Sequence, residues 1–258
     1  MSLLNSSNPT LSQKIFNRSH SQEEELNGTM TVRGAMNKFG FLLIMVLAGA
    51  AYTWNQYMSA VNPSDVFTLM WVGLIGGFVL ALVITFKPKW SPFLAPVYGL
   101  LEGLFLGAIS VVINEQFRES YPGIVMQAVG LTFGTALAMF LLYNFRIIKA
   151  TEKFKSIMYT AVAGVALFYL VYWIGGMFGL SMPFMSWENG SWLSIGITLV
   201  VIAIAALTLI LDFDMIEKGA ESGAPKYMEW YGAFGLTVTI IWLYIQMLKL
   251  LSQLNSRD

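Results

Sequence analysis

The sequence predicts an all-α polytopic membrane protein with seven transmembrane helices. Of its 258 residues, 56% are hydrophobic and 12% are charged, whereas about 25% of an average soluble domain is charged. The hydrophobic residues number about 144, which suffices for about seven spans of roughly 20 residues each. This composition excludes a soluble enzyme and a disordered chain. The absence of cysteine excludes a disulfide-stapled module and thiol chemistry.

Seven apolar segments, each separated from the next by prolines, glycines or charged residues, give the predicted spans. Each has about 19–23 residues, enough to cross a core of about 30 Å at 1.5 Å per residue. Lipid requires backbone hydrogen bonds to be made within the segment, which favours helices. The shorter alternating segments of an outer-membrane barrel are not seen. The predicted spans are 39–57, 66–86, 93–113, 124–143, 157–179, 192–211 and 230–251.

The first 37 residues are polar and predict a cytoplasmic tail that is disordered or partly helical. The tail has no apolar stretch like that of a signal peptide. Met30, Thr31 and Val32 are expected to begin the ordered part of the chain. Residues 38–254 then form the seven-helix transmembrane domain, and residues 255–258 form a short C-terminal tail.

The basic residues predict the orientation of the protein in the membrane. The N-terminal tail and the second, fourth and sixth loops carry 12 of the 15 lysines and arginines, while the opposite side has Arg118, Lys249 and Arg257. Cytoplasmic loops are enriched in basic residues, so the N-terminus is expected to be cytoplasmic. Seven spans then place the C-terminus outside, whereas a re-entrant last segment would return it to the cytoplasm. The net charge of zero gives no indication of nucleic-acid binding.

Acidic residues cluster at the end of the sixth apolar segment, where five of the 15 fall within 18 residues: Asp212, Asp214, Glu217, Glu221 and Glu229. Asp212 directly follows the apolar run 192–211. A carboxylate in that position costs a few kcal/mol unless it is paired, hydrated or protonated. It could therefore sense pH or bind a cation. In the alternative interpretation the helix simply ends in water, with Asp214 and Lys218 as an i,i+4 ion pair.

Glu102 is the one acidic residue well inside a predicted span. It lies next to a stripe of small residues, Gly99, Gly103 and Gly107, which allows another helix to approach closely. We expect Glu102 to face the interior of the bundle. An ionisable residue inside the membrane is a functional candidate. The alternative is a structural role, with a hydrogen bond to a threonine or a tyrosine.

No catalytic constellation is apparent, and we expect neither enzymatic activity nor a cofactor. The single histidine, His20, lies in the polar tail. Histidine catalysis and metal clusters are therefore not expected. The HExxH and GxSxG motifs are absent.

Several short segments are similar to a known family of membrane proteins. They are MTVRG at 30–34, LEG at 101–103, YPGI at 121–124, TEKF at 151–154, LDFDMIE at 211–217 and GAPKYMEWYG at 223–232. With these segments the sequence resembles the Bax-inhibitor-1-like family, and more closely its longer bacterial branch, over residues 30–254. The resemblance implies a central last helix wrapped by the other six, in a bacterial cytoplasmic membrane.

The resemblance also implies a pH-dependent calcium leak controlled by two aspartates, one in each of the last two helices. These share a proton when the pore is closed, and a basic residue near the second helix can latch the sixth-helix acid. Asp212 matches that acid, and Lys87 lies roughly where the basic residue falls. Thr237 stands at the position of the second aspartate, or Gln246 in another register. Neither is acidic, so a proton-sharing pair would need a different carboxylate.

Two functions follow as hypotheses. The first is a proton-modulated leak of calcium or another cation, with Asp212 central and Glu102 in support. Asp214, Glu229 and Thr237 are further candidates for the ion- or pH-sensing site, and Glu102 or Glu229 would have to approach Asp212 to form a pair. The second is a non-transporting regulator or scaffold, in which the tail 2–33 binds a membrane protease or another membrane complex. The expected partners are the lipid bilayer, a transiently bound cation and a membrane protein.

Overall fold

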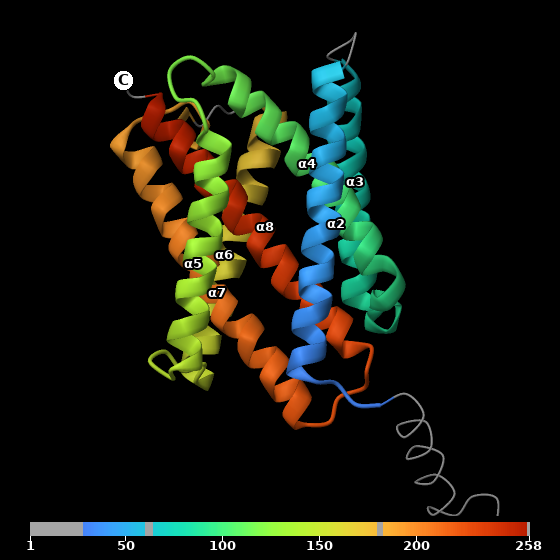
Figure 1. Cartoon of the computed structure of the whole chain (residues 1–258). Coiled ribbons are helices and arrows are strands. Elements are labelled where there is room, and N and C mark those ends of the chain that lie inside the picture. Colours follow the sequence, from blue (N-terminus) through green and yellow to red (C-terminus); the bar gives the residue numbers. More distant parts are fainter. Residues whose placement is uncertain (1–27, 60–63, 180–182, 257–258) are drawn as a thin grey trace, which may run out of the picture.

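The computed structural model describes residues 28–59, 64–179 and 183–256. These residues form seven long helices and two short 3-10 turns (Figure 1). All seven helices are long and apolar enough to cross a membrane, which confirms the predicted fold class. The elements are α2 (Val32–Ser59), α3 (Ser64–Phe86), η2 (Pro88–Trp90), α4 (Ser91–Gln116), α5 (Ile124–Asn144), α6 (Glu152–Met177), η3 (Pro183–Met185), α7 (Trp192–Glu221) and α8 (Met228–Asn255).

Two helix boundaries differ from the sequence prediction in a way that matters for the site. Helix α2 begins at Val32, whereas the first predicted span begins at residue 39. Helix α7 continues past Leu211 to Glu221. The reason is that apolar residues recur at helical spacing beyond the apolar run, so that Phe213 and Ile216 remain buried in the core. Asp212 is therefore an internal residue of α7, about 13 Å from its C-terminal end.

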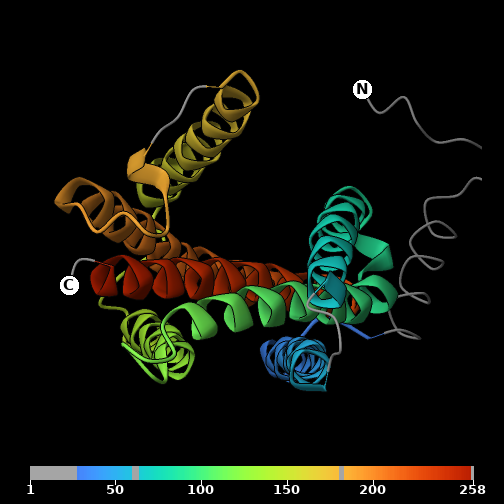
Figure 2. The same cartoon turned by 90° about the horizontal axis from the view of Figure 1, so that it is seen from above.

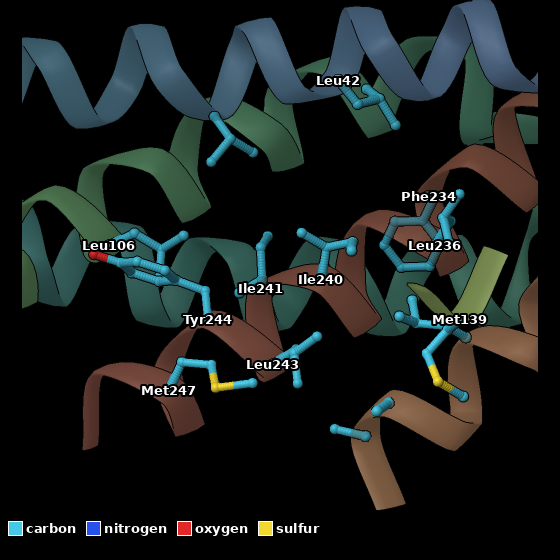
Figure 3. Close-up of a cluster of buried hydrophobic side chains, with 14 of the residues drawn as sticks. Leu42, Leu106, Met139, Phe234, Leu236, Ile240, Ile241, Leu243, Tyr244 and Met247 are labelled. Carbon is cyan, nitrogen blue, oxygen red and sulfur yellow. The ribbon is translucent and has the colours of Figure 1, made fainter. Parts of the chain in front are cut away.

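Helix α8 is the centre of the bundle, as the resemblance implies. It packs against α2, α4, α5 and α7, and it is the most deeply buried of the spans. Figures 1 and 2 show it running obliquely through the assembly. Its apolar side chains, among them Leu236, Ile240 and Leu243, form much of the buried cluster in Figure 3. Helices α3 and α6 depart from the expected wrapping, because α3 packs mainly against α4 and α2, and α6 packs mainly against α7.

The loops rich in basic residues gather at one end of the bundle, at the bottom of Figure 1. We call this the basic end, formed by residues 28–31 and by the loops 87–90, 145–151 and 222–227. Helix α8 starts there and finishes at the opposite end, called the far end. The last helix thus runs from one end of the bundle to the other.

Helices α2 and α4 approach each other closely through facing glycines. A Cβ atom on Gly103 would collide with the Val46 carbonyl oxygen, and one on Gly49 with the Leu100 carbonyl oxygen. Gly107 likewise faces Ala50. The predicted small-residue stripe of α4 is confirmed, and the helix that it accommodates is α2.

Candidate functional site

Asp212 lies at the contact between α7 and α8. A Cβ atom on Gly235 of α8 would stand 3.9 Å from Asp212 Oδ1. The Thr239 hydroxyl, which donates to the Gly235 carbonyl oxygen at 3.3 Å, lies one turn further along α8 beside the same carboxylate. The other oxygen, Oδ2, is buried and has no hydrogen-bond partner in the described part of the chain.

A buried carboxylate oxygen without a partner is costly when the group is ionised, because no solvent or donor replaces its hydration. Within a membrane span that cost is reduced by taking up a proton or by binding a cation. Asp212 is therefore the described acid whose ionised form is least compensated by its surroundings. The missing hydrogen bond identifies it more sharply than its sequence position does.

Neither seventh-helix position suggested by the resemblance provides a partner for Asp212. Residues two apart on a helix point about 200° away from each other. Thr237 therefore lies on the opposite side of α8 from Gly235 and Thr239, where it is fully buried and donates to the Ala233 carbonyl oxygen at 2.8 Å. Gln246 lies nearer the far end, where its amide donates to the Tyr169 hydroxyl at 3.3 Å.

Glu102 lies between α4 and α3, near the middle of α4. A Cβ atom on Gly77 of α3 would stand 2.6 Å from Glu102 Oε1, and the Tyr98 hydroxyl is the hydrogen-bonding partner of the carboxylate. Tyr98 in turn packs edge-on against Phe234 of α8, with 4.9 Å between ring centroids. The tyrosine partner fits the structural alternative, and the structure does not bring Glu102 to Asp212.

Glu229, in the first turn of α8, is fully buried and surrounded by donors. It accepts hydrogen bonds from the backbone N–H and the hydroxyl of Thr31, both at 2.9 Å, and pairs with Lys226 at 2.8 Å and with Lys38. We call Thr31, Lys38, Lys226 and Glu229 the N-terminal clasp. A backbone bridge between Thr29 and Pro225 continues it. Glu229 thus fastens the start of α2 to the start of α8.

The remaining acids of the cluster hold the C-terminal part of α7 in place. Asp214 is buried and pairs with Lys155 of α6 and with Lys218, each at 2.9 Å. The i,i+4 pair between Asp214 and Lys218 is confirmed. Glu217 accepts from Tyr143 and from both terminal nitrogens of Arg146, at 3.1 and 2.5 Å. The hydrogen bonds from Arg146 to Glu217 raise the pKa of that guanidinium above its ordinary value.

Lys87 follows α3 at the basic end, where its side chain is exposed. Within the described ranges it forms no ion pair with Asp212, whose Oδ2 has no partner at all. The latch implied by the resemblance is therefore not closed in this structure. Nor do three acidic or histidine side chains gather closely enough among residues 28–59, 64–179 and 183–256 to hold a metal ion.

Apart from Lys218, sequence reasoning did not find the partners of these acids, because several of them come from distant parts of the chain. Thr31 and Glu229 are 198 residues apart, and Tyr143 and Glu217 are 74 apart. One local signal was available. Tyr98 precedes Glu102 by one helical turn, a spacing that places the two side chains on the same face of a helix.

A comparison with protein families identifies a family that the chain matches. The model of a family described as Bax inhibitor 1 like matches residues 8–256, nearly the whole chain. A search of curated proteins found no match.

Proposed function

Because the chain belongs to the Bax inhibitor 1 like family, we propose that this multi-pass membrane protein mediates a pH-modulated leak of cations, calcium among them. Its basic end then faces the cytoplasm, in agreement with the enrichment of lysine and arginine in cytoplasmic loops. The membrane proposed is the bacterial cytoplasmic membrane.

The observation that carries this proposal is the buried, unpartnered Oδ2 atom of Asp212. When Asp212 is protonated, the neutral group can pack against Gly235 and Thr239 without an uncompensated charge. When it is ionised, the carboxylate favours water and a cation at the α7–α8 contact. Proton uptake and cation passage therefore compete at one side chain.

The other acids have different roles in this proposal. Asp214 and Glu229 each face two lysines, so their charges are already compensated and they hold helices together. Glu102 lies against Gly77 of α3, and we assign it a supporting role at the contact between α3 and α4. A single carboxylate, Asp212, is then the sensor, in place of a pair of acids.

The test is calcium flux into liposomes that contain an indicator, measured between about pH 6 and 8. Wild type is expected to leak more at the higher pH, and Asp212→Asn to lose this pH dependence because its amide cannot ionise. Glu221→Gln serves as the control, since Glu221 is an exposed acid of the same helix. Equal leak from wild type and Asp212→Asn at every pH would overturn the proposal.

A regulator or scaffold is the second candidate, and the N-terminal clasp favours it. The clasp fixes the point at which the preceding tail meets the bundle, next to the start of the central helix. A partner held by the tail would thus act close to α8. Deleting residues 2–27 leaves the clasp residues in place and should abolish co-purification of a stoichiometric membrane-protein partner. If full-length protein has no such partner, this candidate fails.

A further inference from the structure

A second polar site lies at the far end of the bundle, away from Asp212. It is a pocket of about 430 Å³ between α6, the segment after η3 and the C-terminal part of α8. Its lining combines aromatic and polar side chains, chiefly Tyr169, Tyr172, Trp187, Glu188, Gln246 and Lys249.

Lys249 is the unusual member of this lining. It is 4% exposed, and in the described part of the chain its ammonium has neither an ion-pair partner nor a hydrogen-bond acceptor. The nearby polar groups are occupied elsewhere. Gln246 and Tyr169 bond to each other, and Glu188 accepts from Gln116 of α4 at 3.2 Å.

The Lys249 side chain is largely withdrawn from solvent, and an ammonium in such a position is destabilising unless an opposite charge accompanies it. Among residues 28–59, 64–179 and 183–256, no carboxylate forms an ion pair with Lys249. Glu188 lines the same pocket, but its side chain is exposed, and water screens its charge. The pocket therefore places a strong donor beside a space of about 430 Å³, which is large enough for an anion.

The shape and position of the pocket narrow the class of anion. The Tyr172 hydroxyl is a second possible donor in the lining, and the rings of Tyr169, Tyr172 and Trp187 provide apolar surface beside the polar groups. Helix α6 forms one wall, and only Met158 and Gly175 of that helix are buried. In a membrane the pocket would thus border on lipid. Lysine is a frequent ligand of phosphate groups.

We propose that this pocket binds a phosphate group through Lys249, either on a phospholipid headgroup or as a free ion. The inference does not depend on the cation leak, because the pocket is formed by other residues at the other end of the bundle. It also does not depend on which end of the bundle faces the cytoplasm.

The experiment measures binding to the purified, delipidated protein in non-ionic detergent by titration calorimetry. The probes are dihexanoyl phosphatidylglycerol and inorganic phosphate. Wild type is expected to bind at least one of them with one site per chain. Lys249→Met keeps the length of the side chain and removes its charge, so it should weaken that binding at least about tenfold. Lys249→Arg should retain it.

Lys89→Met is the matched control, because Lys89 is an exposed lysine at the basic end, and it should bind like wild type. Binding of the lipid alone identifies a headgroup site, and binding of both probes identifies a general phosphate site. Thermal unfolding of Lys249→Met should occur at or above the wild-type temperature, since the variant loses an uncompensated buried charge. Tyr172→Phe gives a second variant, with several-fold weaker binding expected. Equal binding by wild type and Lys249→Met, or no binding of either probe by wild type, would overturn the proposal.

Discussion

Asp212 and Asp214 lie two residues apart on α7 and have opposite surroundings. Asp214 pairs with two lysines, each at 2.9 Å, whereas Asp212 Oδ2 is buried without a hydrogen-bond partner. Two residues that are two positions apart on a helix point about 200° away from each other. Asp214 is therefore turned to α6 and Asp212 to α8. One carboxylate stabilises the helix packing, and the other has an oxygen atom that no donor among the described residues reaches.

This difference predicts opposite effects of the same substitution. Asp212→Asn should stabilise the protein at pH 8 by about 1–3 kcal/mol, because an uncompensated buried charge is removed. Asp214→Asn should destabilise it by about 1 kcal/mol, because Lys155 and Lys218 lose their partner. The measurement is thermal unfolding in detergent. The gain for Asp212→Asn should shrink as the pH is lowered, since protonation then removes the same charge. If both variants shifted the unfolding temperature in the same direction, the opposite surroundings described for Asp212 and Asp214 would be contradicted.

The N-terminal clasp should contribute to stability through Glu229. Glu229→Gln removes the charge that faces Lys38 and Lys226, and it should lower the free energy of unfolding by about 1–3 kcal/mol. Limited proteolysis near residue 30 should become faster at the same time. Glu221→Gln, an exposed acid one loop earlier, should change neither quantity. If Glu229→Gln and Glu221→Gln had the same free energy of unfolding and the same rate of proteolysis, the N-terminal clasp would not contribute to stability.

The sequence predicted the helices well because their signal is local and compositional. The length and apolar content of a segment predict a membrane span. The distribution of basic residues predicts which loops lie at the same end of the bundle. The end of α7 was missed because its last turns combine charged residues with buried apolar ones, such as Asp214 beside Phe213. Apolar content falls there, while helical periodicity persists.

The site was only partly predictable, for a different reason. Asp212 follows an apolar run and could be singled out from the sequence. Whether its carboxylate is paired depends on the rotation of α8 about its axis, which decides that Gly235 and Thr239 face it and that Thr237 does not. The pair between Glu229 and Lys38 depends in the same way on how the starts of α2 and α8 meet at the basic end. Such contacts join distant segments, and no local pattern encodes them.

The α2–α4 contact should tolerate no side chain larger than hydrogen at Gly103. Gly103→Ala places a Cβ atom on the Val46 carbonyl oxygen, so the helices must separate, at a cost of about 1–3 kcal/mol. Gly130→Ala is the matched control, because nothing lies within 4 Å of a Cβ at that position of α5. It should be neutral or slightly stabilising, as alanine favours helix more than glycine does. Equal melting temperatures for the two variants would show that the contact is looser than described.

The orientation of α8 predicts where a second acid can interact with Asp212. Thr239→Asp puts a carboxylate beside Asp212, and Thr237→Asp puts one on the opposite side of α8. As the pH rises and both groups ionise, repulsion should make Thr239→Asp progressively less stable. Adding Asp212→Asn should relieve that loss. A double-mutant cycle by thermal unfolding at pH 5 to 8 should thus give a coupling of about 1 kcal/mol or more at the highest pH for position 239.

The same cycle at position 237 should give additive effects, because the two side chains point away from each other. Thr237→Asp should lower stability by itself, since Thr237 is fully buried and a charge there has no counter-ion. Asp212→Asn should leave that loss unchanged. Coupling at position 237 and additivity at 239 would mean that α8 is rotated by about half a turn from the orientation described. In that case Thr237, the position that the family resemblance assigns to the second aspartate, would be the residue facing Asp212.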